Sequence, residues 1–266
     1  MERSELVKSY LKFCRIREDS ISGKCINLKG ESWFYPTALL PLGDFIQAKR
    51  DDFNFIQPSD GNLCNYINLM IYPPMRSLKK NKSYAPLARL PKDDPQNGAS
   101  ALHAIYPERG DWKSYGGRNT YMEIISELTD NIYEHSSFNN GMVMAQRYDN
   151  KGFIEACVFD NGITIAGSYE KALDTKFSGL EAIQKAVEGL STKSNKERGT
   201  GLQNTIKLVL HMKGEVLLVS GDGMVYGNFS DTVGFNLKQP NTLNGTLVAI
   251  RFPIQKEEVN LYDIIK

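Results

Sequence analysis

Two side chains suited to magnesium–phosphate chemistry stand four positions apart in the segment Glu127-Leu-Thr-Asp-Asn131-Ile-Tyr-Glu-His135. On a helix this spacing puts Glu127 and Asn131 on one face, one turn apart. The carboxamide oxygen of asparagine is a hard ligand for Mg2+, and a carboxylate can orient or deprotonate a water molecule. An ordinary solvated helix face accounts for the same pair, because this spacing is common.

Two further polar residues stand at the ends of apolar runs. Asp160 closes the run Phe153–Asp160 and is followed two residues later by Gly162, and Thr246 begins the last apolar run of the chain. A carboxylate at the end of a buried strand can accept a hydrogen bond from an exocyclic amine, and a threonine hydroxyl beside it can support that contact. An ordinary turn also explains each segment.

A polar, basic and glycine-containing loop runs from Ser191 to Leu202, ahead of a helix with an apolar period. The cations would attract phosphate, the glycines would let a ligand approach the backbone, and the helix start offers unpaired amides. This composition is typical of a lid that closes over phosphates, although a plain junction between loop and helix has it too. The candidate ligand-binding residues of the loop are Lys193, Arg198, Gly199, Thr200, Gly201 and Leu202.

The elements that must position these residues are clearest from residue 118 onwards. Apolar residues at three- and four-residue steps predict a helix over Thr120–His135. Helices on one face of a largely antiparallel sheet form a two-layer α+β sandwich, and we expect that fold over residues 118–255, with 256–266 as a C-terminal tail. The other expected elements are helices over Ser178–Leu190 and Gly201–Met212, and strands over Gly141–Tyr148, Phe153–Asp160, Glu215–Ser220 and Thr246–Phe252.

The chain before residue 118 is expected to form a small α/β domain over residues 1–72 and a connection over residues 73–117. The connection holds six prolines, and this density blocks long helices and central strands. The domain follows from the order of its apolar patterns. These predict a helix over Glu2–Arg17, a strand over Lys24–Lys29, a helix over Pro36–Lys49 and a strand over Cys64–Tyr72.

Composition excludes several classes of protein. The 266 residues are 41% hydrophobic and carry a formal net charge of +1, which supports a real core and argues against a surface built for nucleic acid. No apolar run approaches the roughly 18 residues of a membrane helix, and residues 1–19 lack the apolar stretch of a secretory signal. The four cysteines are scattered without a Cys-x-x-Cys pair, which favours a reducing cytoplasm over a disulfide framework or a zinc site.

In their order and separation, the four segments resemble the motifs of the GHKL superfamily, the ATP-binding fold of gyrase, histidine kinases and MutL. Glu127–His135 is similar to the N box, Asp160–Gly162 to the first glycine box, Arg198–Leu202 to the second and Gly245-Thr246 to the third. The resemblance covers about half of the chain. One position departs from it: where the first glycine box usually reads Asp-x-Gly-x-Gly, this chain has Thr164 in place of the second glycine.

The resemblance implies a Bergerat fold, with ATP bound between the sheet and a flexible lid. Asn131 would hold the Mg2+ that bridges the phosphates, and Glu127 would be the general base or the acid that orients water. Asp160 would accept a hydrogen bond from the adenine N6 amine with support from Thr246, and Gly162 would let the chain pass close to the base. The phosphates would be bound by Lys193, Arg198, Gly199, Thr200, Gly201 and Leu202.

The implied function is that of a cytoplasmic, Mg2+-dependent ATP-binding protein with slow ATP hydrolysis coupled to lid closure and to a protein partner. The pattern Glu-Leu-x-x-Asn-x-x-x-His is most similar to ATPases of the anti-sigma-factor type, so a protein serine kinase acting on a STAS-like partner is an alternative. A nucleotide-gated binding module without turnover is another. The strand–helix–strand order of the N-terminal domain, with Trp33-Phe-Tyr-Pro-Thr37 at the helix entry, resembles STAS-type domains, and an unrelated small α/β cap is the alternative. Neither nucleic acid nor a membrane is expected as a partner, and the oligomeric state is left open.

Overall fold

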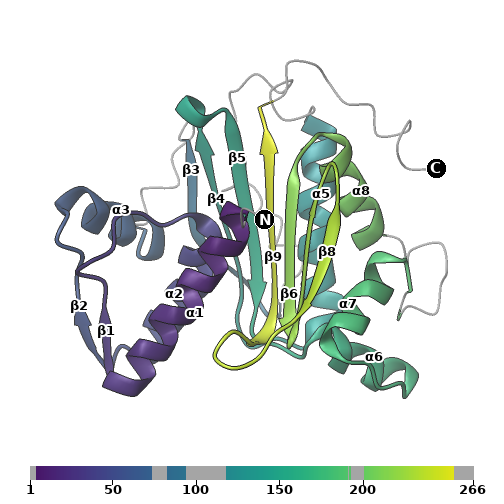
Figure 1. Ribbon diagram of the computed structural model, residues 1–266, viewed down its shortest axis with the longest axis horizontal. Coiled ribbons are helices and arrows are strands. Elements are labelled where there is room, and N and C mark those ends of the chain that lie inside the picture. The colour runs from purple at the N-terminus through teal and green to yellow at the C-terminus, as the bar shows by residue number, and fades with distance from the viewer. Residues whose placement is uncertain (1–3, 74–82, 94–117, 191, 193–200, 255–266) are drawn as a thin grey trace.

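The computed structural model describes residues 4–73, 83–93, 118–190, 192 and 201–254. Their centre is a seven-stranded antiparallel sheet with the order β3-β4-β5-β9-β6-β7-β8 (Figure 1). A pair of short parallel strands, β1 (Cys25–Asn27) and β2 (Asn54–Ile56), lies among the N-terminal helices. The strands of the large sheet are β3 (Tyr84–Leu90), β4 (Gly141–Tyr148), β5 (Phe153–Asp160), β6 (Glu215–Gly221), β7 (Gly223–Asn228), β8 (Thr232–Asn236) and β9 (Leu243–Pro253).

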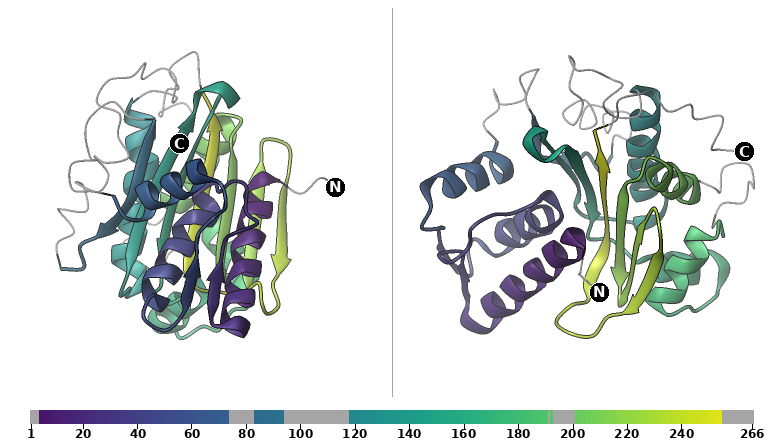
Figure 2. Two further views of the ribbon diagram at one scale, coloured as in Figure 1. Left: turned by 90° about the vertical axis from the view of Figure 1, so that its left-hand side faces the viewer. Right: turned by 45° about the horizontal axis from the view of Figure 1, so that its top comes forward.

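Helices cover both faces of the sheet, as two views show (Figures 1 and 2). The mixed α+β class expected for the C-terminal part is confirmed, and the N-terminal residues add a further layer on the opposite face. One face carries α5 (Arg118–Asn131), which continues as a π-turn over Ile132–Ser136, and α6 (Ile165–Leu173), α7 (Gly179–Val187) and α8 (Gly201–His211). The other carries α1 (Glu5–Gly23) and α2 (Pro36–Lys49), with α3 (Gly61–Ile71) beside β3.

Strand β5 contributes to the hydrophobic clusters on both sides of the sheet. Cys157 and Phe159 belong to the cluster beneath α1 and α2, whereas Ile154, Ala156 and Val158 belong to the cluster beneath α5 and α8. This alternation follows from the two-residue period of a strand. Because α1 and α2 share one cluster with the sheet, the residues before position 73 pack as a layer on it rather than around a core of their own.

Several elements expected from the sequence are present with the same bounds. The helix over Pro36–Lys49 and the strands over Gly141–Tyr148 and Phe153–Asp160 are confirmed. The strand expected over Cys64–Tyr72 is wrong, because that segment lies in helix α3 and its C-terminal end.

Helix α3 shows how an apolar run can mislead. Its buried residues Leu63, Ile67, Met70 and Ile71 recur at helical spacing, and the asparagines between them are exposed. Asp60 begins the helix, because its Oδ1 accepts a hydrogen bond from the amide two residues later at 2.7 Å. An apolar segment of this length fits a strand equally well until that start signal is recognised.

The proline-rich connection contains a strand that the sequence pattern did not predict. β3 pairs with β4 as an edge strand, and its register shifts between Ala85 and Ala88. Pro86 lies in this irregular stretch, where a residue that lacks an amide donor is tolerated. The high density of prolines therefore permits a strand here only at the edge of the sheet.

A buried carboxylate ties the N-terminal layer to the sheet. Glu155 of β5 is fully buried, and its Oε1 accepts hydrogen bonds from the amide (2.9 Å) and the hydroxyl (2.6 Å) of Thr37 in α2. Its Oε2 accepts from two guanidinium nitrogens of Arg251 on β9, at 3.0 and 2.6 Å. The Arg251 guanidinium also lies over the rings of Tyr35 and Phe153, 4.7 and 4.3 Å from their centres. The charge of Glu155 is thus matched where water cannot reach it, and the Arg251 side chain is only 11% exposed.

Replacing Glu155 with alanine should strongly destabilise the protein, because the largely buried Arg251 loses the carboxylate that accepts two of its hydrogen bonds. The expected loss in the free energy of unfolding is about 3–5 kcal/mol, as for other broken buried ion pairs. The control is Glu188→Ala, which removes the exposed Lys185–Glu188 pair and should cost about 1 kcal/mol or less. Urea unfolding measures both losses, and similar values in the two variants would contradict the anchoring role of Glu155.

Candidate functional site

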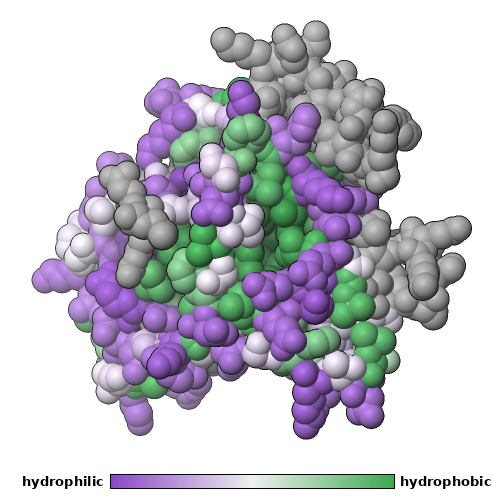
Figure 3. All heavy atoms as spheres, turned by 45° about the vertical axis from the view of Figure 1, so that its right-hand side comes forward, coloured by the Kyte–Doolittle hydropathy of each residue, from purple (hydrophilic) through white to green (hydrophobic). Residues whose placement is uncertain are grey.

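A pocket lies between the sheet and the helices of the α5–α8 face. Strands β5, β9 and β6 form its floor, and α5, the π-turn, α6, the end of α7 and the start of α8 form its walls. The cavity measures about 120 Å³, and its lining is mostly apolar. Seen from the side of α6–α8, hydrophobic residues gather near the centre of the molecule's face, with hydrophilic residues around them (Figure 3).

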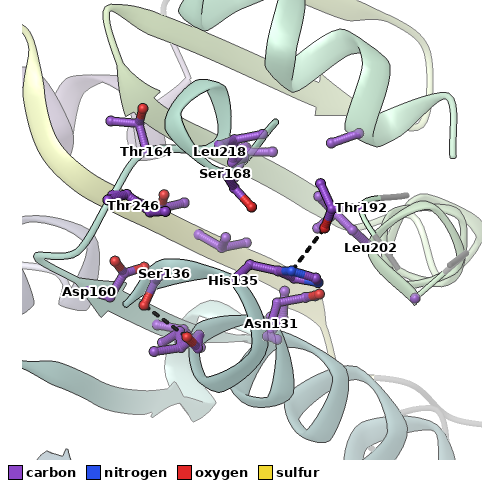
Figure 4. Close-up of a pocket in the computed structure, with 18 of the residues that line it drawn as sticks. Asn131, His135, Ser136, Asp160, Thr164, Ser168, Thr192, Leu202, Leu218 and Thr246 are labelled. Atoms are coloured by element: carbon purple, nitrogen blue, oxygen red, sulfur yellow. Dashed lines mark hydrogen bonds between the residues drawn. The ribbon is translucent and has the colours of Figure 1, made fainter. Parts of the chain in front are cut away.

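Polar residues line both ends of the pocket, and Ser168 of α6 lies between them (Figure 4). Asp160 and Thr246 lie at one end, and Asn131, His135 and Thr192 lie at the other. Apolar side chains line most of the space between the two ends. A ligand that fills the pocket would therefore meet polar groups at both ends and a mostly apolar surface between them.

Three polar side chains form a row across the floor. Asp160 of β5 is the register partner of Thr246 on β9, which is the register partner of Ser220 on β6. Directly paired residues point to the same side of a sheet, so the three side chains share the pocket side. The hydroxyls of Thr246 and Ser220 are 2.9 Å apart, and the Ser220 hydroxyl also accepts from the amide of Ile165 at 2.9 Å. This network fixes Thr246 beside Asp160.

Asp160 is a buried carboxylate whose partners in the described structure are neutral. It is 3% exposed, and its Oδ1 accepts a hydrogen bond from the Gly162 amide at 2.9 Å. Burial raises the pKa of Asp160 to about 7, partly opposed by hydrogen bonds from Gly162 and Ser136. Glu155 on the same strand, by contrast, is paired with Arg251. A buried carboxylate that the fold does not neutralise is typical of a functional site.

The end of α5 holds the loop after Asp160 in place. The Ser136 carbonyl, in the π-turn, accepts a hydrogen bond from the Ile163 amide at 2.6 Å. A Cβ on Gly162 would lie 2.0 Å from that carbonyl oxygen. The close approach of two backbone segments therefore requires glycine at position 162. Its expected role in letting a base approach stays a prediction.

The opposite end of the pocket is formed by Asn131 and the start of α8. Asn131 lines the cavity, and within the described structure its buried Nδ2 has no hydrogen-bond partner. Gly201, the first residue of α8, lines the same cavity. The start of a helix carries unpaired amides and a partial positive charge. This end is therefore suited to an anionic or strongly polar group.

Glu127 lies near this end but does not line the cavity. Its carboxylate is pressed against Gly201: a Cβ added there would lie 1.7 Å from Glu127 Oε2. The expected pairing of Glu127 with Asn131 on one helix is thus present, but only Asn131 lines the pocket in this conformation.

Two hydrogen bonds that the sequence did not predict hold the chain after α7. The Tyr169 hydroxyl donates to the Leu190 carbonyl at 2.6 Å, and His135 Nδ1 lies 3.0 Å from the Thr192 hydroxyl (Figure 4). His135 is the last residue of the candidate segment Glu127–His135. Its place in that segment could have identified it as a residue of the site. Tyr169 gave no such signal, because α6 itself was not predicted.

Thr164, the departure from the first glycine box, has a local structural role. Its hydroxyl accepts a hydrogen bond from the Gly167 amide at 3.1 Å and caps the start of α6. Thr164 also lines the pocket. A helix therefore begins where the family pattern has its second glycine.

The structure brings most of the expected site residues in the described ranges together. Gly162 adjoins the cavity through its hydrogen bond to Asp160, and Glu127 lies behind the start of α8. Of the expected site residues, those that line the cavity are Asn131, Asp160, Gly201, Leu202 and Thr246. Lys193, Arg198, Gly199 and Thr200 lie outside the described residues. Within the described residues, no cluster of three His, Cys, Asp or Glu side chains is arranged for a metal, and no helix is long and apolar enough to cross a membrane.

Asp160→Asn should stabilise the ligand-free protein at alkaline pH. Folding raises the pKa of Asp160 from 3.8 to about 7, so the folded protein binds this proton more tightly and loses stability as the pH rises through that interval. Asparagine cannot ionise, so the variant should melt above the wild type at about pH 8, and the difference should shrink towards about pH 4. Melting curves across this range measure the effect. A difference that does not vary with pH would contradict a buried, ionising Asp160.

No family model, no curated protein and no solved structure matches this chain. The functional conclusion therefore depends on the residues and the geometry of this pocket.

Proposed function

We propose that the protein binds Mg2+–ATP in this pocket and hydrolyses it slowly, as an ATPase of the GHKL type with a Bergerat fold. One observation carries the proposal: buried Asp160 stands beside Thr246 at one end of an apolar cavity, and Asn131 and the start of α8 stand at the other. The order of the four sequence motifs supports it, as does the layer of helices over one face of an antiparallel sheet.

The Asp160 end suits an adenine base. An ionised carboxylate only accepts hydrogen bonds, and the N6 amine of adenine donates them. The Thr246 hydroxyl can bond an adjacent ring nitrogen, directly or through a water molecule. The apolar lining, which includes Ile163 and Leu218, would pack against the faces of a planar ring.

The opposite end suits phosphates and a magnesium ion. The first turn of α8 offers backbone amides and the positive end of a helix dipole. Asn131 offers a carboxamide that is not yet fully hydrogen-bonded within the described structure, and its oxygen is a hard ligand of the kind that Mg2+ prefers. When bound, Mg2+ would neutralise part of the negative charge of the phosphates. The residues present therefore fit both groups.

The residues of the chain would act mainly by positioning. Asp160 and Thr246 would hold the base, Asn131 would hold the metal, and the start of α8 would hold the phosphates in line for attack. Glu127, one turn before Asn131, would orient or deprotonate the attacking water. Transfer to a serine of a partner would use the same groups, with a hydroxyl in place of the water.

Asp160→Asn should weaken ATP binding by about 2 kcal/mol or more, roughly thirtyfold in Kd. The asparagine amide presents a donor to the N6 amine and loses the charge-assisted acceptor. Asp174→Asn is the matched control, because Asp174 is exposed and has a positive φ of 51° that asparagine tolerates. Calorimetry at about pH 8, where Asp160 is ionised, measures both. Wild-type affinity in Asp160→Asn would exclude this adenine site.

Glu127→Ala and Asn131→Ala should fail in different ways. The alanine at position 127 should abolish turnover without loss of ATP affinity, because a base acts on water and not on the bound nucleotide. The alanine at position 131 should remove the Mg2+ dependence of binding. Binding and phosphate release, measured with and without Mg2+, separate the two roles, and identical behaviour of the variants would show that the division is wrong.

Labelled ATP distinguishes hydrolysis from its alternatives. Incubation of the wild type with γ-labelled ATP, alone and with candidate partner proteins, should release free phosphate if the protein is an ATPase. A labelled partner would instead identify a kinase, and neither product would identify a nucleotide-gated binding module.

A further inference from the structure

Glu127 is placed beside the end of the pocket where phosphates are expected. It lies one helical turn before Asn131, and its carboxylate contacts Gly201 at the start of α8. A Cβ added to Gly201 would lie 1.7 Å from Glu127 Oε2 and 2.7 Å from its Cδ. Only glycine at position 201 leaves room for the carboxylate in this place.

A carboxylate in this position has an electrostatic consequence. Helix α8 has 11 residues, and its start carries the partial positive charge of unpaired amides. That charge stabilises an acidic side chain, and it stabilises a phosphate group by the same interaction. Two anions that share one helix start also repel each other. Glu127 and a bound phosphate therefore compete for the start of α8.

Asn131 lines the part of the cavity next to the start of α8. Its buried Nδ2 has no partner in the part of the chain that the structure describes, and it lines the same cavity as Gly201. An unsatisfied buried polar atom beside a cavity indicates a missing polar group. Glu127 does not fill that cavity, because it is not part of the lining. The carboxylate thus occupies the helix start while the space next to Asn131 stays available.

We propose that the Glu127 carboxylate occupies the start of α8 in the ligand-free protein as a substitute for phosphate, and that the phosphates of a bound nucleotide displace it. This inference rests on the proposed function. The Glu127 carboxylate would then become free to orient water only after the phosphates have bound. It also means that Glu127 weakens the binding of every ligand that carries phosphates and leaves the binding of adenosine unchanged.

Glu127→Gln tests the competition, because glutamine keeps the shape of the side chain and removes its charge. The full chain is titrated by calorimetry with ATP, ADP, inorganic tripolyphosphate and adenosine. The variant should bind the three phosphate ligands roughly two- to thirtyfold more tightly than the wild type, the range expected for a charge at a helix start. Its affinity for adenosine should be unchanged. Glu123→Gln, one turn earlier and exposed, is the matched control and should alter none of the affinities.

Melting curves give a second measurement that does not depend on adenine. Ligand-free Glu127→Gln should melt below the wild type, because the helix start loses its anion. Tripolyphosphate should then raise the melting temperature of Glu127→Gln more than that of the wild type. An equal rise in the two proteins would overturn the proposal.

The outcomes separate this inference from the proposed function. Equal or weaker binding of phosphate ligands by Glu127→Gln would overturn the displacement, and so would a tighter affinity for adenosine. If neither protein binds ATP or adenosine, the proposed ATP site is wrong. Tighter binding of tripolyphosphate by Glu127→Gln would in that case still support the competition at the start of α8.

Discussion

Strand β5 is buried on both faces, and the rest of the structure depends on this constraint. Its side chains alternate between two hydrophobic clusters, so each of its carboxylates must find partners within the layer that it faces. Glu155 enters the layer of α1 and α2, where Thr37 and Arg251 surround it. Asp160 enters the opposite layer at the floor of the pocket. One strand therefore both anchors the N-terminal helices and forms the polar end of the site.

The two carboxylates of β5 differ in their role: Glu155 stabilises the fold, and Asp160 is available to a ligand. The charge of Glu155 is matched by a guanidinium within the fold, so the pair holds two layers together without a ligand. Asp160 accepts a hydrogen bond from a backbone amide, and burial raises its pKa to about 7. Its ionisation therefore costs stability in the ligand-free protein. A ligand that donates a hydrogen bond to Asp160 would offset that cost. A buried carboxylate that pairs with no cation among the described residues is therefore a reasonable centre for a binding site.

The elements predicted correctly from the sequence are those with a clear apolar pattern within one segment. The elements that were missed depend on contacts between segments far apart in the chain. Phe153–Asp160 is apolar on both sides of Glu155, as in a strand buried on both faces, and its bounds were predicted correctly. The segment of α3 was misread because a short apolar run does not distinguish a helix from a strand. In the site, the resemblance of the motifs to the GHKL pattern, and not spacing alone, implied that Asn131 and Asp160 share one pocket, and both residues line it. The π-turn over Ile132–Ser136 was not predicted, because a change in backbone hydrogen bonding leaves no trace in an apolar pattern.

The distribution of rigid and adaptable contacts indicates where a ligand would change the protein. The sheet has clusters packed on both faces, and Glu155 and Asp160 are about 17 Å apart along one strand, so the N-terminal layer should respond little to events in the pocket. The helices on the other side also pack on a hydrophobic cluster, but several contacts at the rim of the pocket are single polar contacts. These include the bond between His135 and Thr192 and the contact of Glu127 with α8. Such contacts can be exchanged for bonds to a ligand without repacking a core. Under the proposed function, a surface that changes when nucleotide binds is therefore expected on the side of α7 and α8, and not on the side of α1 and α2.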